Sequence, residues 1–375
     1  MSKFILSTAL AFALLFSFSA GASADSDITS VDISVSAKSA VLIEGSSDSV
    51  IYEKNSRERR PMASTTKIMT ALVALESCPP DRKVTIPREA CGIEGSSVYL
   101  REGEVFTMEE LLYALLLSSA NDAATAIALE VGGDIDSFAD MMNEKAEQIG
   151  LCDTHFTNPH GLDDEEHYTS AYDLAVLSAH ALENGDFRRI VSTYRQTIGE
   201  GESTRHLLNH NRLLKLYDDA LGVKTGYTKT SGRCLVSAAE RDGVRLVAVT
   251  LSDPDDWKDH TRLLDYGFSC YSSVKLCGEG EITLTLPCTG GDADTVTLRS
   301  REALTVPLPN GHGEITRRID APHMLFATVN AGDAIGEAVF LCDGREIART
   351  ALYAENSSVF IEKKGFFERL LELYR

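Results

Sequence analysis

The spacing of apolar residues changes near residue 275, and this change divides the chain into two parts. Before it, stretches such as "FTMEELLYALLLSS" and "SAYDLAVLSAHALEN" have the spacing of buried or amphipathic helices. After it, short runs such as "EITLTLP", "DTVTLRS" and "ALTVPLP" alternate apolar and polar residues and are separated by Gly, Pro, Asn and Asp. With 375 residues, the chain is long enough for two domains. We therefore predict a mixed helix and sheet domain over residues 25–275 and a small all-β domain, sandwich-like, over residues 276–355.

The first 24 residues form a separate segment. Lys3 supplies a basic start, an uncharged apolar run follows, and "ASA" at Ala22–Ala24 has the small residues of a cleavage site. A retained membrane anchor would need a longer apolar span. Residues 1–24 are therefore predicted to be a signal peptide, which places the mature chain outside the cytoplasmic membrane.

The charge and the cysteines exclude some classes of protein. A formal charge of −20 argues against a nucleic-acid partner, because phosphate binding needs clustered Lys and Arg. None of the eight cysteines forms a CxxC pair, which argues against a zinc knuckle. Export permits disulfides, and Cys78 with Cys91 or Cys270 with Cys277 are close pairs. Free thiols buried in the core fit the same sequence equally well.

Within residues 25–275, both helices and strands are expected, which indicates α/β or α+β packing. Thr107 and Glu110 have the spacing of a capping box at the start of one helical block, and Gly132 and Gly133 close that block. Asp242-Gly243 is a hairpin turn between two strands. The other elements expected are a hairpin over residues 40–55 and helices over residues 64–76, 137–150, 170–184 and 258–271.

The last segment, residues 356–375, has the pattern of an amphipathic helix. Such a helix can lie on a membrane surface, and three aromatic residues favour this interpretation. The alternative is a helix that packs back onto the β domain. Its apolar face is formed by Phe366, Phe367, Leu370, Leu371 and Tyr374.

A first chemical pattern is Ser64-x-x-Lys67, at the start of the apolar stretch "STTKIMTALVALE". Residues three apart share one face of a helix. A serine hydroxyl needs a base beside it to act as a nucleophile, and a lysine can be that base when burial and nearby positive charge lower its pKa. The pattern alone is weak, because a helix cap beside a solvated lysine gives the same letters.

Two further patterns are weak when each is taken alone. In "SSANDAA", Ser119 and Asn121 interrupt an apolar helical stretch, where embedded polar groups need partners; an ordinary capped turn is the alternative. In "GVKTGYT", at the expected start of an edge strand, Lys224 offers a second cation and Gly226 lets a ligand approach the backbone. The end of a strand facing solvent is the alternative there. Thr225 and Thr228 would offer hydroxyls to a carboxylate.

Together, in the order S-x-x-K, S-x-N, K-T-G, the three patterns resemble the motifs of the penicillin-binding serine peptidase superfamily. More narrowly, the chain is similar to the low-molecular-mass D-alanyl-D-alanine carboxypeptidases. The resemblance covers nearly the whole chain, including "PMASTTKIMTALVALE", "LLLSSANDAATAIA", "FTNPHGLDDEEHYTSAYDLA" and "GVKTGYT". It implies a penicillin-binding, β-lactamase-like transpeptidase fold of the α/β (α+β) class, followed by a small all-β domain and an amphipathic C-terminal helix.

The resemblance also implies a role for each motif residue, with no metal or cofactor. The substrates would be peptidoglycan stem peptides ending in D-Ala-D-Ala, and β-lactams would be covalent inhibitors. In these roles Ser64 is the nucleophile, Lys67 is the base, and Ser119 relays a proton to the leaving amine. Asn121 holds the substrate amide, Gly226 admits the ligand backbone, and Lys224 with Thr225 and Thr228 binds the substrate carboxylate. The N–H groups of Ser64 and Tyr227 form the oxyanion hole.

Three alternative functions share these features. A β-lactamase of this fold uses a glutamate in an E-x-x-L-N pattern, whereas the segment with Glu165 and Glu166 lacks that pattern. Slow deacylation of a bound penicillin is therefore expected. A D,D-endopeptidase would carry the same three motifs. A non-catalytic cell-wall-binding scaffold is disfavoured because all three motifs are intact.

The roles of several charged and aromatic residues remain open in the sequence. Members of this family often hold the substrate carboxylate with an arginine near the last helix of the catalytic domain. Trp257, Lys258 and Arg262 are candidates for this role in carboxylate binding. The polar Arg233 lies where an apolar residue is expected. His160, in "NPHGL", and His167 are predicted to be structural histidines rather than bases.

Overall fold

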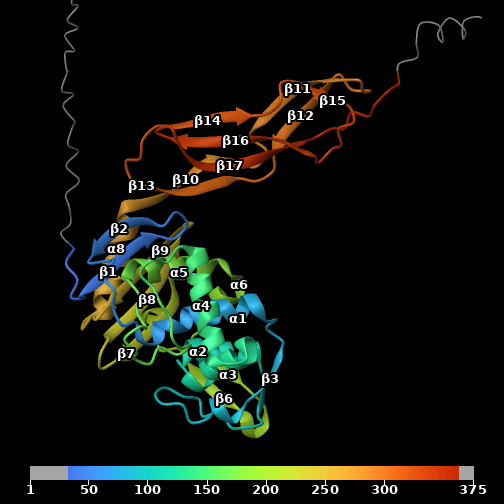
Figure 1. Ribbon diagram of the computed structural model, residues 1–375. Helices are drawn as coiled ribbons and strands as arrows, with labels where there is room; N and C mark the ends of the chain where they lie inside the picture. Colours follow the sequence, from blue (N-terminus) through green and yellow to red (C-terminus); the bar gives the residue numbers. More distant parts are fainter. Residues whose placement is uncertain (1–32, 363–375) are drawn as a thin grey trace, which may run out of the picture. The chain divides into compact units, whose positions relative to one another are not determined.

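The computed structural model describes residues 33–362, and its first part is built on a five-stranded antiparallel sheet (Figure 1). The strand order is β2-β1-β9-β8-β7, so β7 is an edge strand. Residues expected to form a hairpin near the N-terminus pair as β1 and β2, and the Asp242-Gly243 turn joins β8 to β9. The bounds are β1 Ser39–Glu44, β2 Ser49–Lys54, β7 Ala220–Thr228, β8 Gly232–Arg241 and β9 Val244–Leu251.

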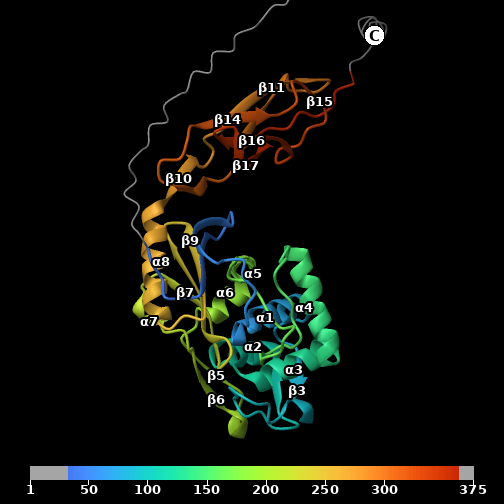
Figure 2. The same cartoon turned by 60° about the vertical axis from the view of Figure 1, so that its left-hand side comes forward.

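Helices cover both faces of this sheet, as Figure 2 shows. The helix α8 (Asp256–Cys270) packs on one face, where Gly267 approaches Leu42 and Leu246 so closely that a Cβ would clash with both. Side chains that alternate with these along the strands, such as Val41 and Val247, join the large helical core on the other face. The sheet is therefore buried on both sides.

The helical part contributes most of the core and is joined by short strands. The predicted capping box at Thr107 and Glu110 is present, and the helical block ends at Gly132 and Gly133 as expected. The elements are η1 Ala63–Thr66, α1 Lys67–Ser77, β3 Lys83–Thr85, η2 Arg88–Ala90, β4 Val105–Thr107, α2 Met108–Leu117, α3 Asn121–Gly132, α4 Ile135–Ile149, α5 Ala171–Glu183, α6 Gly185–Val191, β5 Arg195–Ile198, η3 Gly201–Ser203, β6 Arg205–Leu208 and α7 Leu213–Leu216.

Two local predictions differ from the structure. The helix expected to begin at Ser64 starts as the 3-10 turn η1, and the α-helix begins only at Lys67. Ala63, the first residue of this turn, has a positive φ of +48°, which is uncommon for a residue other than glycine. The K-T-G motif lies in the second half of β7 rather than at the start of the strand, because Ala220–Val223 already pair with β8.

The second part contains strands only, among the residues that the structure describes. A six-stranded sheet has the order β14-β16-β17-β12-β11-β15, and β10 pairs with β13. Strand β10 spans the boundary predicted at residues 275 and 276, so the domain limits stay predictions. The bounds are β10 Tyr271–Cys277, β11 Thr283–Thr289, β12 Thr295–Ser300, β13 Leu304–Pro309, β14 Ile315–Asp320, β15 Leu325–Phe326, β16 Ala334–Cys342 and β17 Arg345–Ala354.

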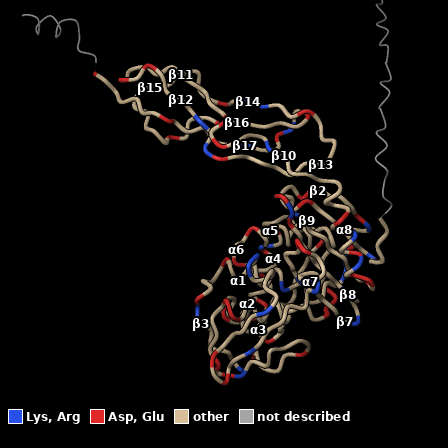
Figure 3. Tube along the Cα trace, turned by 180° about the vertical axis from the view of Figure 1, so that it is seen from behind, with Lys and Arg blue, Asp and Glu red and all other residues tan. Residues whose placement is uncertain are grey.

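The described range bears on several further predictions. The signal peptide and most of the amphipathic tail lie outside residues 33–362. The helix expected from residue 356 is wrong for its described start, because residues 356–362 are not helical and Ser358 and Phe360 pair with Val329 and Gly291 of the β domain. Within that range no helix is long and apolar enough to cross a membrane. All eight cysteines are described, and each is a free thiol. Acidic and basic positions are interspersed along the trace (Figure 3), which fits solubility as the reason for the negative charge.

Candidate active site

The turn η1 and helix α1 place Ser64 and Lys67 side by side. Lys67 Nζ lies 3.0 Å from Ser64 Oγ. The Lys67 side chain is fully buried, whereas Ser64 is partly open to solvent. The first backbone hydrogen bond of the turn runs from Thr65 N to Met62 O, so the N–H group of Ser64, one residue earlier, is not used within the turn. Ser64 therefore presents a hydroxyl beside an amine and an N–H group free of the turn.

The partners of Lys67 fit a neutral amine. Besides Ser64 Oγ, Nζ contacts Asn121 Oδ1 at 2.7 Å and the carbonyl oxygen of His160 at 2.6 Å. These two oxygens can only accept, so they take two N–H groups. A neutral amine then has its lone pair left for the Ser64 hydroxyl. Burial, followed by the nearby charge of Lys224, holds the pKa of Lys67 well below its usual range, while Asp122 opposes this shift.

A second lysine and serine face the first pair. Ser119 sits in the break between α2 and α3, with a φ of +60°. Lys224 Nζ, from β7, donates to Ser119 Oγ at 3.0 Å and to the carbonyl oxygen of Thr225 at 2.8 Å. Burial lowers the pKa of Lys224 to about 7. The two polar residues of the interrupted helical stretch, Ser119 and Asn121, thus each contact a different lysine.

Strand β7 runs close to the nucleophile because Gly226 has no side chain. A Cβ at Gly226 would lie 3.1 Å from both Ser64 N and Ala63 Cβ. Between η1 and β7 opens a cavity of about 470 Å³. Its lining includes five of the predicted site residues, namely Ser64, Ser119, Thr225, Gly226 and Tyr227, together with Ser96, His210, Arg233, Cys234, Asp256 and Trp257.

Thr228 is placed differently from the other predicted site residues. Its hydroxyl donates to Asp163 Oδ1 at 2.8 Å and contacts Ser231 Oγ at 3.0 Å, and it does not line the cavity. Asp163 comes from the segment after "NPHGL". Thr228 therefore ties this segment to the end of β7.

Arg233 is the cavity residue that the sequence pattern left unexplained. Strand pairing places it opposite Tyr227, and its guanidinium binds the Asp256 carboxylate through two nitrogens, at 2.9 and 2.5 Å. The same guanidinium lies 5.9 Å from the centre of the Trp257 ring. Lys258 and Arg262 contact Asp255 and Asp259 instead, and neither lines the cavity.

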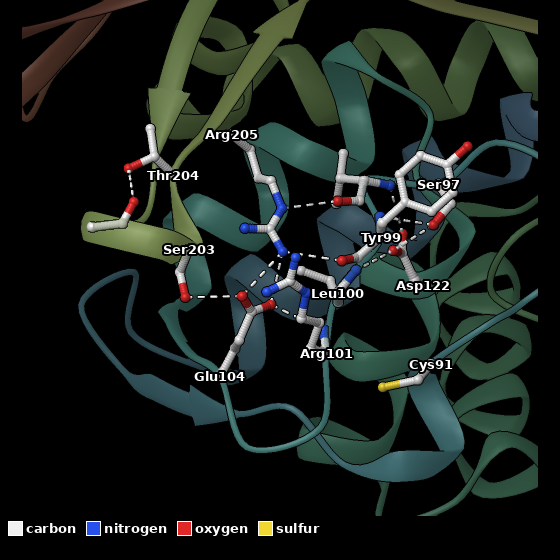
Figure 4. Close-up of polar contacts among 12 residues, drawn as sticks. Cys91, Ser97, Tyr99, Leu100, Arg101, Glu104, Asp122, Ser203, Thr204 and Arg205 are labelled. Atoms are coloured by element: carbon white, nitrogen blue, oxygen red, sulfur yellow. Dashed lines mark hydrogen bonds and ion pairs between the residues drawn. The ribbon is translucent and has the colours of Figure 1, made fainter.

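A loop before β4 closes one side of the cavity, and Figure 4 shows how it is held. The buried Asp122 carboxylate accepts from Ser97 Oγ at 2.6 Å and from Leu100 N at 2.9 Å. Arg205 donates to the carbonyl oxygen of Val98 and pairs with Glu104 at 2.9 Å. The loop in turn holds Asn121, whose N–H and Nδ2 donate to the carbonyl oxygens of Ser96 and Glu94.

The two histidines considered as bases are held in structural contacts. His167 Nε2 lies 2.7 Å from Thr66 Oγ1, and its Nδ1 accepts from Thr157 N. His160 Nδ1 accepts from Leu162 N, and burial lowers the pKa of His160 to about 3. Neither ring makes a hydrogen bond to Ser64. Among residues 33–362, no group of three or more His, Cys, Asp and Glu is placed to hold a metal ion.

Comparisons with known proteins agree with this arrangement. Residues 25–255 match the family model for D-alanyl-D-alanine carboxypeptidase, and residues 271–359 match that for the C-terminal domain of penicillin-binding protein 5. The D-alanyl-D-alanine carboxypeptidase DacF of Bacillus subtilis is 33% identical over 341 residues, which cover 88% of this chain and 87% of that protein. DacC of Escherichia coli is 29% identical, covering 90% of this chain and 87% of its own length.

Solved structures show the same fold. Penicillin-binding protein 5 of Haemophilus influenzae superposes with a TM-score of 0.65 at 28% identity, covering 87% of this chain and 98% of that one. A Streptococcus pneumoniae structure described as a peptidoglycan synthesis regulatory factor (PBP3) has a TM-score of 0.74 at 24% identity, and covers 87% of this chain and all of its own.

The chain belongs to the D-alanyl-D-alanine carboxypeptidase family of serine peptidases. The predicted fold, a mixed penicillin-binding-protein domain followed by an all-β domain, is thereby confirmed. The family also supports the activity predicted from the three motifs, which is removal of the terminal D-alanine from peptidoglycan stem peptides, and β-lactam binding.

Proposed function

We propose that this carboxypeptidase works through an acyl-enzyme on Ser64, with neutral Lys67 as the base. The observation that carries the proposal is the set of contacts at Lys67 Nζ: two obligate acceptors, Asn121 Oδ1 and His160 O, and one hydroxyl, Ser64 Oγ. The amine takes the Ser64 proton as Oγ attacks the carbonyl carbon of the penultimate D-alanine. No other side chain makes a hydrogen bond to Ser64 Oγ among the described residues.

The remaining motif residues complete the cycle in this proposal. The N–H groups of Ser64 and Tyr227 stabilise the oxyanion, with each donor in such sites contributing roughly 3–4 kcal/mol. Ser119 passes a proton to the leaving amine, which departs as D-alanine, and Asn121 holds the substrate amide. Water then attacks the ester, and the tetrapeptide stem leaves. The contact between Lys224 Nζ and Ser119 Oγ supports a relay through that hydroxyl.

The substrate carboxylate would bind at the end of the cavity formed by β7 and β8. Thr225 lines one side of it and Arg233 the other. Lys224 lies behind this lining, where its amine contacts Ser119 Oγ and the carbonyl oxygen of Thr225. Asp256 holds the Arg233 guanidinium in a fork geometry that fixes its plane. We therefore assign Arg233, rather than Lys258 or Arg262, to the binding of the substrate carboxylate. Thr228 supports the strand from behind through Asp163.

A penicillin-labelling experiment tests the proposed nucleophile. Purified protein is incubated with a fluorescent penicillin, and the label is followed with time on a denaturing gel. We expect Ser64→Ala to lose all label, whereas Ser96→Ala, which alters another hydroxyl lining the same cavity, keeps it. Label that stays for many minutes supports slow deacylation; rapid release would assign the chain to the β-lactamase alternative.

The preferred substrate and the location have their own tests. Carboxypeptidase and endopeptidase activities are separated by comparing monomeric pentapeptide stems with cross-linked stems; release of D-alanine from the monomer is expected. We further propose that residues 1–24 direct export and that the part of the predicted tail beyond the described residues, 363–375, attaches the protein to the outer face of the cytoplasmic membrane. Deletion of residues 363–375 should then move the protein from the membrane fraction to the soluble fraction.

A further inference from the structure

Exposed apolar side chains gather at one end of the β domain. Among residues 33–362, eleven large apolar residues are substantially exposed, and five of these eleven fall in two short segments. We call these five the apolar tip: Met324 (42% exposed), Phe326 (70%), Val359 (52%), Phe360 (60%) and Ile361 (47%). The other six are scattered over the catalytic domain, so the concentration at this end is specific to it.

Backbone pairing brings the two segments of the apolar tip together. Strand β15, which carries Phe326, runs parallel to the end of β11. Beyond it, Phe360 pairs with Gly291, and Ile361 N donates to the carbonyl oxygen of Gly290. The Phe360 ring lies over Gly290, where a Cβ would be 3.8 Å from it. Both segments thus flank one stretch of chain, at the end of the domain that β11 and β15 share (Figures 1 and 2).

The shape and the area of the apolar tip fit a deformable partner better than the flat surface of another protein. In extended chain, successive side chains point to opposite faces, so Val359 and Phe360 project to different sides of the sheet end. With on the order of 200 Å² for each side chain when fully exposed, the tip presents roughly 500 Å² of apolar surface. A stable protein interface buries about 800 Å² on each partner. The tip falls short of that area.

The adjoining sequence indicates a lipid surface. Lys363 and Lys364 follow the apolar tip almost directly. Ammonium groups beside inserted aromatic and branched side chains are the arrangement that suits the boundary between anionic headgroups and acyl chains. Residues 363–375, which carry the predicted amphipathic pattern, continue from the same point.

We propose that the apolar tip is a second membrane contact, which inserts into the interface of an anionic phospholipid bilayer. The proposal rests on the exported, membrane-facing location proposed above. The tail alone would leave the β domain free to pivot about its attachment. A second contact in the folded domain would fix the orientation of the β domain against the bilayer.

Vesicle flotation with matched variants tests the proposal. The vesicles contain phosphatidylglycerol and phosphatidylcholine in equal parts. Phe326→Ser/Phe360→Ser should lower the partition coefficient about tenfold or more, given the apolar area removed from the lipid contact. Val50→Ser/Leu216→Ser changes two exposed apolar residues of the catalytic domain, 44% and 56% exposed, and should leave the coefficient unchanged. Each variant should keep full carboxypeptidase activity, which shows that the catalytic domain is folded, and the wild-type circular dichroism spectrum and thermal unfolding profile, which test the β domain as well.

The same experiment on protein lacking residues 363–375 separates the two membrane proposals. Weaker binding that falls further with the two serine substitutions supports both contacts. Tail deletion without effect, combined with a loss in the serine variant, removes the tail proposal and keeps the apolar tip. Full binding of the serine variant, in both the complete and the shortened protein, overturns the tip proposal.

A fluorescent probe distinguishes lipid from a covering by the chain itself. The chain has a single tryptophan, Trp257, in the catalytic domain. In Phe360→Trp protein, brominated phosphatidylcholine mixed with phosphatidylglycerol should quench the added fluorescence, while wild-type Trp257 stays unquenched. Emission that is already shifted to the blue without vesicles, and is not quenched by them, would show that residues 363–375 or a second copy cover the tip, and would overturn the proposal.

Discussion

Asp122 offers the sharpest test of how the loop beside the cavity is held. Its carboxylate is fully buried and has no ion-pair partner within the described residues. Oδ2 accepts from Ser97 Oγ and Leu100 N, and Oδ1 accepts from Val98 N and Ala123 N. In Asp122→Asn an NH₂ group replaces one oxygen. It then faces either the N–H groups of Val98 and Ala123 or the N–H group of Leu100, since the Ser97 hydroxyl can rotate to accept.

The expected cost follows from those contacts. At least one hydrogen bond to a charged acceptor is lost, a buried backbone N–H is left unpaired, and the remaining bonds are made to a neutral amide instead of a carboxylate; together these changes should lower the free energy of unfolding by about 3 kcal/mol. For a domain of this size, that lowers Tm by roughly 6–12 °C. Asp140→Asn, on the exposed face of α4, should leave Tm unchanged and serves as the control.

The same substitution should also affect the reaction. Because the loop holds Asn121 through Ser96 and Glu94, its loosening should slow acylation by a labelled penicillin about tenfold, in line with the sensitivity of catalysis to small misplacements. Thermal unfolding and single-turnover acylation are measured on the same preparations. An Asp122→Asn protein with wild-type Tm and acylation rate would refute the role assigned to this carboxylate.

Three further predictions follow from single contacts. Lys67→Met should lower the acylation rate about 10³-fold without loss of folding by circular dichroism, and an unchanged rate would contradict its role as base. The pKa of Lys224 is about 7, so Lys224 loses its proton as the pH rises through 7. The ratio of kcat/KM for a carboxylate-terminated peptide to that for its amide-terminated analogue should therefore fall over this pH range, and a constant ratio would exclude Lys224 from carboxylate binding. Gly161→Ala would place a Cβ 1.9 Å from Ala63 O at a φ of +85° and should unfold or severely destabilise the protein, whereas Gly92→Ala, at +74° with open space, should cost about 1 kcal/mol.

Much of the fold could be predicted because its signals are local. A capping box needs only residues three apart, as at Thr107 and Glu110, and a two-residue hairpin turn needs only Asp242 and Gly243. The three motifs were separated by long stretches, and each was ambiguous alone. Their order indicated a common site, and the structure places Ser64, Ser119 and Gly226 around one cavity.

The rest depends on tertiary contacts that no local pattern encodes. Arg233 is unexplained in sequence, because its partner Asp256 is 23 residues away and its position opposite Tyr227 is set by strand pairing. Thr228 has the expected place in the motif, yet Asp163, 65 residues earlier, takes its hydroxyl. The start of α1 at Lys67 depends on the strained backbone of Ala63, which lies against the loop containing Gly161.

The central claim is that Ser64, activated by neutral Lys67, carries the acyl group. Mass spectrometry of the intact protein after incubation with penicillin, followed by peptide mapping, tests it most directly. The account predicts one added penicilloyl group, located on Ser64, in wild-type protein and none in Ser64→Ala. An adduct of the same mass and yield in Ser64→Ala, or one mapped to Ser119 or Cys234, would contradict it.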